Sequence, residues 1–159
     1  MSLSLLREFC AENFTDVPAA IEAGADRIEL CDNLAVGGTT PSAGVIGAAT
    51  VYAHEHGARV MTMIRPRGGD FVYGPAELQM MQSDIETACR LGTDGIVFGC
   101  LERREHGFWL DLSAIEALVA RVRWMQDQRD WSGVPREFDR EDQRIDITFH
   151  MAFDELAPE

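Results

Sequence analysis

Glutamate and cysteine recur in one three-residue pattern near the start of this chain. Glu8-Phe9-Cys10 and Glu29-Leu30-Cys31 share the Glu-x-Cys spacing, and each lies in a short, mostly apolar segment. Side chains two residues apart on a β-strand point to the same face, so each glutamate shares a face with its cysteine. Thiols on neighbouring strand ends, with the thioethers of Met61 and Met63 nearby, are soft donors suited to Cu(I). The pattern therefore indicates a candidate copper site built from the two cysteines.

The same residues also have plainer interpretations. Buried cysteines are more often inert, small apolar residues than metal ligands. Carboxylates beside a thiol raise its pKa, which opposes the thiolate form that metal binding requires. The two glutamates could instead pair with Arg65 and Arg67 in a buried structural network. We predict in particular that Arg65 is buried and paired with Glu8 or Glu29.

A second set of residues could act on an anionic molecule. His150 ends a predicted strand, and its ordinary pKa near neutrality suits acid–base chemistry. Together with Glu8 or Glu29 it could transfer a proton, while Arg65 and Arg67 hold an anionic substrate. An enzyme of this kind is the alternative to a copper-binding protein. A buried structural histidine is a further interpretation of His150.

Strands and helices alternate along the chain. The hydrophobic pattern predicts strands over residues 6–10, 27–31, 59–64, 95–99 and 146–150. Helices are predicted over residues 15–24, 43–56 and 75–92, and again after a capping box at Ser113 and Glu116. Gly24, Gly57 and Gly92 each stand between a helix and the next strand. Repeated units of one strand and one helix predict an α/β fold with a parallel sheet.

Polar side chains on one strand face favour a TIM-type β/α barrel over an open sheet. An open, doubly wound sheet would have continuous aliphatic strands. In a barrel the site lies at the carboxyl ends of the strands, where the sequence places Cys10, Cys31, Arg65, Arg67, Asp70 and His150. Five strands cannot close an eight-stranded barrel. We therefore predict an incomplete barrel in one domain over residues 1–159, with Gln126 to Arg144 as the end of the last helix plus a solvated connection.

Four motifs, in order, resemble the copper homeostasis protein CutC family. They are GADRIELC at 24–31, GGTTPS at 37–42, IRPRGGDF at 64–71 and TFHMAFD at 148–154. The resemblance implies a cytoplasmic TIM-type barrel associated with copper tolerance and copper binding, without implying a particular reaction. It implies a group of residues at the barrel mouth, with the two cysteines as the copper contacts: Glu8, Cys10, Glu29, Cys31, Arg65, Arg67, Asp70, His150 and Asp154.

Two departures from the family pattern stand out. Met151 occupies a position where the family usually has arginine, which removes a charge beside His150. Family members also run beyond 200 residues, so the chain is expected to be truncated after its fifth strand or completed by another chain. Open sheet edges then predict that it dimerises or aggregates.

The composition limits the partners. The net charge is −13, from 27 acidic and 14 basic residues, so nucleic acid and anionic membranes are poor partners. All the basic residues are arginine, which excludes lysine chemistry. No export signal or spanning segment is recognisable, and the four cysteines form no disulfide pattern. We therefore expect reduced thiols in the cytoplasm, and a metal ion or a small anionic molecule as partner.

Overall fold

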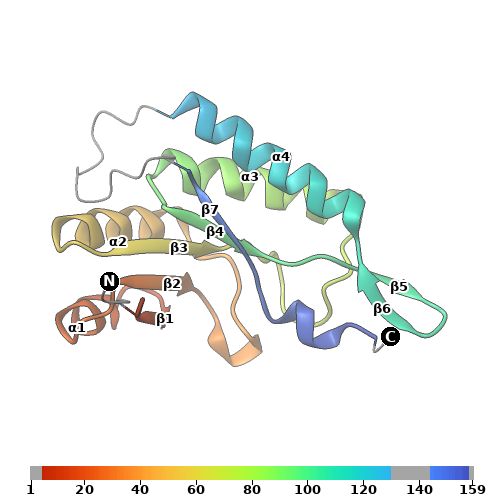
Figure 1. Cartoon of the computed structure of the whole chain (residues 1–159), viewed down its shortest axis with the longest axis horizontal. Helices are drawn as coiled ribbons and strands as arrows, with labels where there is room; N and C mark the ends of the chain where they lie inside the picture. Colours follow the sequence, from red (N-terminus) through yellow and green to blue (C-terminus); the bar gives the residue numbers. More distant parts are fainter. Residues whose placement is uncertain (1–4, 130–143, 158–159) are drawn as a thin grey trace.

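A parallel five-stranded sheet forms the centre of the fold in the computed structural model, which describes residues 5–129 and 144–157 (Figure 1). The strands lie in the order β1, β2, β3, β4, β7, and every neighbouring pair is parallel. The strands are β1 (Glu8–Glu12), β2 (Arg27–Cys31), β3 (Arg59–Met63), β4 (Gly95–Phe98) and β7 (Asp146–Phe149). The α/β fold with a parallel sheet is thus confirmed.

Four helices connect these strands, and each helix packs against the next one in chain order. They are α1 (Val17–Glu22), α2 (Ala43–Glu55), α3 (Pro75–Arg90) and α4 (Leu112–Gln128). The strand order has no reversal, whereas a doubly wound sheet reverses its order at a switch point. Within the described residues the sheet stays open at β1 and β7. The structure therefore shows a singly wound parallel sheet and not a closed barrel.

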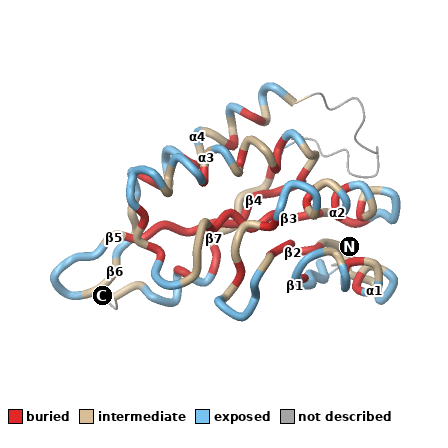
Figure 2. The backbone as a smooth tube through the Cα atoms, turned by 180° about the vertical axis from the view of Figure 1, so that it is seen from behind, coloured by how far each residue is buried: buried red, intermediate tan, exposed pale blue. Residues whose placement is uncertain are grey.

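The two faces of the sheet bury different residues. Ile28, Val60 and Ile96 belong to the larger core, packed with apolar side chains of the helices. Residues one position further along the strands point to the other face, where Cys31, Met61, Met63 and Val97 form a second buried cluster. Figure 2 shows that burial follows β2 to β4 and the inner sides of the helices, while β1 is exposed.

An aspartate fixes the start of two strand–helix units in the same way. The Asp26 carboxylate accepts the backbone N–H of Arg7 at 2.8 Å, and the Asp94 carboxylate accepts that of Val60 at 2.8 Å. Gly24 and Gly92, two residues before each aspartate, have φ of 100° and 93°, which favours glycine. The similar stretches GADRI at 24–28 and GTDGI at 92–96 therefore play the same structural role.

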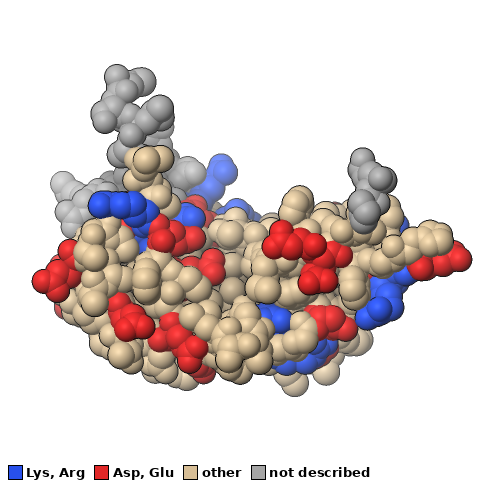
Figure 3. Space-filling view, turned by 90° about the horizontal axis from the view of Figure 1, so that it is seen from below, with Lys and Arg blue, Asp and Glu red and all other residues tan. Residues whose placement is uncertain are grey.

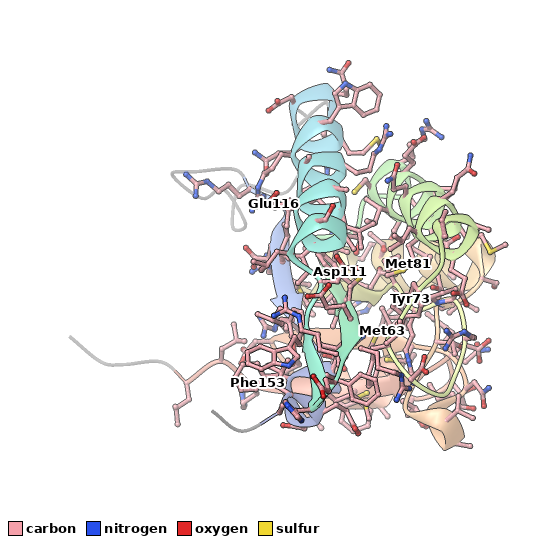
Figure 4. All side chains as sticks on the ribbon, turned by 90° about the vertical axis from the view of Figure 1, so that its right-hand side faces the viewer. Met63, Tyr73, Met81, Asp111, Glu116 and Phe153 are labelled. Carbon is pink, nitrogen blue, oxygen red and sulfur yellow. The ribbon has the colours of Figure 1, made fainter. Side chains whose placement is uncertain are left out.

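Two local expectations differ from the structure. The first strand runs over 8–12 rather than 6–10, and Asp111 rather than Ser113 caps α4 by accepting the N–H of Ala114 at 2.9 Å. Asp111 lies at the start of α4 in Figure 4. The expected helix end within 126–144 agrees with the structure, since α4 extends to Gln128, and residues 130–143 of the expected connection lie outside the described part of the chain.

A hairpin that the sequence analysis missed follows β4. Its strands are β5 (Leu101–Arg104) and β6 (Gly107–Leu110), paired antiparallel. With a 3-10 helix, η3 (Met151–Glu155), the hairpin lies beyond the carboxyl ends of the parallel strands (Figure 1). An isolated bridge between Phe108 and Leu156 joins them. These segments border the end of the sheet where sites are built in β/α proteins.

Candidate metal site at the ends of β1 and β2

Strand register brings the two Glu-x-Cys patterns together. Cys10 lies opposite Glu29, and Glu12 lies opposite Cys31. The two cysteines are therefore diagonal neighbours on one face of adjacent strands. Their Sγ atoms are 3.9 Å apart, and the ligand atoms of Cys10, Glu29 and Cys31 all lie within 4.8 Å of one another. The register thus brings the two Glu-x-Cys patterns together on one face of the sheet.

The site keeps its thiols protonated in the absence of a metal. Burial, followed by the charges of Cys10 and Glu29, raises the pKa of Cys31, and burial followed by the charge of Glu29 raises the pKa of Cys10. Burial and the charge of Glu8 also raise the pKa of Glu29, while its hydrogen bond with Cys10 opposes this rise. A bound cation would reverse these effects, because it favours thiolate and carboxylate forms.

A loop after β2 covers one side of this group. The loop contains a short 3-10 helix, η1 (Leu34–Val36), and is tied to β1 by the Leu34 N–H, which donates to Glu12 Oε2 at 2.7 Å. At Gly38 an added Cβ would lie 3.2 Å from Cys31 Sγ and 3.7 Å from Met63 Cε. Cys31 is accordingly buried, whereas Cys10 is exposed on the edge strand. A ligand therefore reaches the group from the side of Cys10.

The expected pairing of Arg65 with a glutamate is wrong. Arg65 is buried, as predicted, but its guanidinium donates to three backbone carbonyls: those of Val36 at 2.7 Å, Gly38 at 2.9 Å and Gly69 at 2.8 Å. Glu8 instead forms an ion pair with Arg27, its register partner on β2. Arg65 therefore holds the loop over Cys31 in place rather than neutralising a carboxylate.

Arg67 and Asp70 belong to a neighbouring ion-pair network. Arg67 Nε donates to Glu77 Oε1 at 2.5 Å, and its Nη1 lies 3.3 Å from Asp70 Oδ1. Arg103 of β5 approaches the same aspartate at 3.7 Å. Backbone oxygens of Gly68, Asp70 and Val72 also accept from Arg67. Arg67 was expected to hold an anionic substrate. Its guanidinium instead donates most of its hydrogen bonds to groups within the chain.

His150 and Asp154 lie at the end of β7, apart from the thiols. The His150 Nδ1 accepts the backbone N–H of Ala152 at 3.1 Å, and its ring packs against Phe71 with centroids 5.0 Å apart. Burial, and then the charge of Arg65, lowers the pKa of His150 to about 4. Asp154 is exposed on η3. No contact joins His150 to Glu8 or Glu29 in the described part of the chain.

Two residues near these groups were missed from the sequence. Gly38, with φ of 87°, is in the sequence only one residue of the motif at 37–42, although its lack of a side chain lets the loop approach Cys31. Tyr73 is buried in the segment that leads from β3 to α3 (Figure 4). Nothing in the pattern of the sequence distinguishes it from an ordinary apolar residue before a helix.

The remaining features of the chain add no second thiol group. Cys89 and Cys100 are buried apart from the first pair, and burial raises their pKa values to about 11 and about 12.

Acidic side chains are scattered widely over the face in Figure 3, in keeping with the net charge of −13. Among the described residues, no helix combines the length and the apolar character needed to cross a membrane.

Comparison with known proteins gives a consistent assignment. The family model for the CutC family matches residues 5–126. A family protein CutC from Enterococcus faecalis is 52% identical over 155 residues, which are 98% of this chain and 63% of that protein. A human protein named copper homeostasis protein cutC homolog is 38% identical over 149 residues, covering 94% of this chain and 45% of the human protein.

A solved structure agrees with these matches. The crystal structure described as that of a copper homeostasis protein CutC from Streptococcus agalactiae superposes with a TM-score of 0.76 at 46% identity, over 96% of this chain and 62% of that one. The chain thus spans less than two thirds of the length of these relatives. The match nevertheless includes both Glu-x-Cys strands and the loops around them. The chain belongs to the CutC family.

Proposed function

We propose that this chain binds Cu(I) through the thiolates of Cys10 and Cys31, and that it serves copper homeostasis in the cytoplasm. The observation that carries the proposal is the convergence of two thiols and one carboxylate, with all ligand atoms within 4.8 Å of one another. The family membership supports it, since the human relative is named for copper homeostasis. Unlinked cysteines are typical of the reducing conditions of a cytoplasm.

The donor set fits Cu(I) better than Zn²⁺. Metal–thiolate bonds are about 2.3 Å long, so one ion can contact both sulfurs, which lie 3.9 Å apart. Soft thiolates select Cu(I), whereas structural Zn²⁺ takes four ligands. The described group offers three ligands, and the methyl group of Met63 lies beside it near Gly38.

Glu29 is the group placed to receive a proton when the ion binds. Metal binding requires the thiols to lose their protons. The thiol of Cys10 lies within 4.8 Å of the Glu29 carboxylate, and burial and the charge of Glu8 raise the pKa of that carboxyl. A carboxylate with a raised pKa accepts a proton more readily than an ordinary one. Once Glu29 has passed that proton to solvent, its carboxylate supplies a negative charge beside the bound cation.

The proposal is tested by anaerobic Cu(I) titration against a competing chelator. Removing both soft ligands in Cys10→Ser/Cys31→Ser should weaken Cu(I) binding by roughly 100-fold or more. The matched control is Cys89→Ala/Cys100→Ala, which removes the two remaining thiols and should leave the affinity unchanged. Zn²⁺ should bind the unmodified chain more weakly than Cu(I). Equal Cu(I) affinity in the double serine variant would overturn the proposal.

A further inference from the structure

Three buried side chains near the carboxyl ends of the strands each carry a polar atom without a hydrogen-bond partner. These atoms are Arg65 Nε, Tyr73 Oη and His150 Nε2. The residues are only 2%, 8% and 8% exposed. Nearly all buried polar atoms in proteins have a hydrogen-bond partner, so an unpartnered one calls for an explanation. Three at the same end of the sheet point to a missing ligand.

Arg65 and His150 both lie against Phe71, and Tyr73 lies near Arg65. The Arg65 Cζ lies 4.7 Å from the centroid of the Phe71 ring, and the His150 ring lies 5.0 Å from the same centroid. Tyr73 is close enough to Arg65 that the guanidinium partly offsets the rise in the pKa of the tyrosine caused by burial. The charge of Arg65 likewise reaches His150. Side chains from the segment after β3 and from the end of β7 therefore share one environment.

All three free atoms present a hydrogen to a ligand. Arg65 Nε is always a donor, and the tyrosine hydroxyl can donate. Since His150 Nδ1 accepts the N–H of Ala152, the proton of the neutral ring resides on Nε2. The group thus offers three donors and one full positive charge.

The charge of Arg65 has no counterion among the residues that the structure describes. The hydrogen bonds of its guanidinium go to the carbonyls of Val36, Gly38 and Gly69. A buried cation is ordinarily paired with an anion, because its desolvation is costly. The nearby carboxylate of Asp70 lies against Arg67 and Arg103 instead.

We propose that Arg65, Tyr73 and His150 bind a small oxyanion, namely the carboxylate or phosphate group of a metabolite. The donors Nε, Oη and Nε2 would contact its oxygens, and the guanidinium would balance its charge, as charge-assisted hydrogen bonds favour. This site is distinct from the thiols of Cys10 and Cys31. It also replaces Arg67, which the sequence analysis named as an anion ligand, with the residues Tyr73 and His150.

The test uses calorimetric titration of the chain with inorganic phosphate and with acetate, at constant ionic strength in chloride. Tyr73→Phe removes one donor and little else, so it should weaken binding of the preferred oxyanion about tenfold. Tyr52→Phe is the matched control, because Tyr52, on α2, is the other tyrosine in the chain. It should bind like the unmodified chain. Preference for phosphate or for acetate identifies the class of ligand.

A second variant, His150→Asn, and a titration with Cu(I) provide two further checks on the proposed oxyanion site. His150→Asn retains an acceptor for the N–H of Ala152 but places no donor at the position of Nε2, so it should also weaken oxyanion binding. The Cu(I) affinity of Tyr73→Phe should be unchanged, which separates this inference from the proposed copper site. The inference is overturned if neither oxyanion binds the unmodified chain, or if Tyr73→Phe binds as tightly as Tyr52→Phe.

Discussion

The guanidinium of Arg65 donates to the carbonyl oxygen of Gly38 at 2.9 Å, and this bond secures the loop that covers Cys31. Gly38 lies against the Cys31 thiol, so a buried arginine on one loop determines how far a thiol on another strand is exposed. Loops that carry sites are generally positioned by a rigid scaffold in this way. Family resemblance placed Arg65 at the mouth, and the structure assigns it this positioning role.

Replacing Arg65 should therefore loosen the loop. Arg65→Met leaves three carbonyls without their donor, which should lower the free energy of unfolding by on the order of 3 kcal/mol. The reaction of Cys31 with a thiol reagent should become faster, while the pKa of Glu29 should not change. Arg90→Met is the control, since Arg90 is exposed and pairs only with Glu86 on the same helix. An unchanged Cys31 rate would contradict the role of the loop.

Glycine at position 38 should be required for copper binding and not only for backbone geometry. Gly38→Ala introduces a Cβ 3.2 Å from Cys31 Sγ at a φ of 87°, whereas Gly57→Ala adds one with nothing within 4 Å at a φ of 75°. Both variants should lose about 1 kcal/mol or more of stability through backbone strain. Only Gly38→Ala should weaken Cu(I) binding in a chelator competition. Equal losses of affinity in both variants would show that strain alone is responsible.

Acid should destabilise the fold through His150. Its pKa is lowered from 6.5 to about 4 in the folded chain, so the unfolded state binds more protons between these values. The contribution of the neutral His150 ring to the free energy of unfolding is fully present above pH 6.5, and it is lost as the pH falls towards 4. The loss should reach roughly 2–3 kcal/mol between neutral pH and about pH 4.5, measured by urea unfolding. His150→Asn should lack this component, whereas His106→Asn, at an exposed turn, should retain it.

The open edges of the sheet should cause the 159-residue chain to associate. In the described residues β1 and β7 each have one unpaired edge, and such edges pair readily with other chains. Phe9 on β1 is 42% exposed. Light scattering at micromolar concentration should show species larger than 17.7 kDa, fewer of them in Phe9→Arg than in the control Trp124→Arg on α4. A monodisperse 17.7 kDa particle that unfolds cooperatively would contradict this prediction.

The local sequence pattern was sufficient to predict that strands and helices alternate along the chain. The glycines at 24, 57 and 92 and the apolar periods around them act over a few residues, so they can be recognised without knowing the fold. The hairpin at 101–110 escaped because its strands have four residues each and the charged run Glu102-Arg103-Arg104-Glu105 masks any alternation. Ser113 and Glu116 match a capping box, yet Asp111 caps the helix, since helix ends depend on where the preceding chain enters.

The sequence by itself determined that Glu and Cys share a strand face in each Glu-x-Cys pattern, because the period of two is a property of one strand. Only the tertiary structure decided that the two patterns meet, because the register of β1 against β2 places Cys10 opposite Glu29 and brings the sulfurs to 3.9 Å. The partners of Arg65 were likewise beyond the sequence. A buried guanidinium satisfies its donors with whichever acceptors the packed loops present, and here these are carbonyl oxygens, which every residue has and no residue pattern marks.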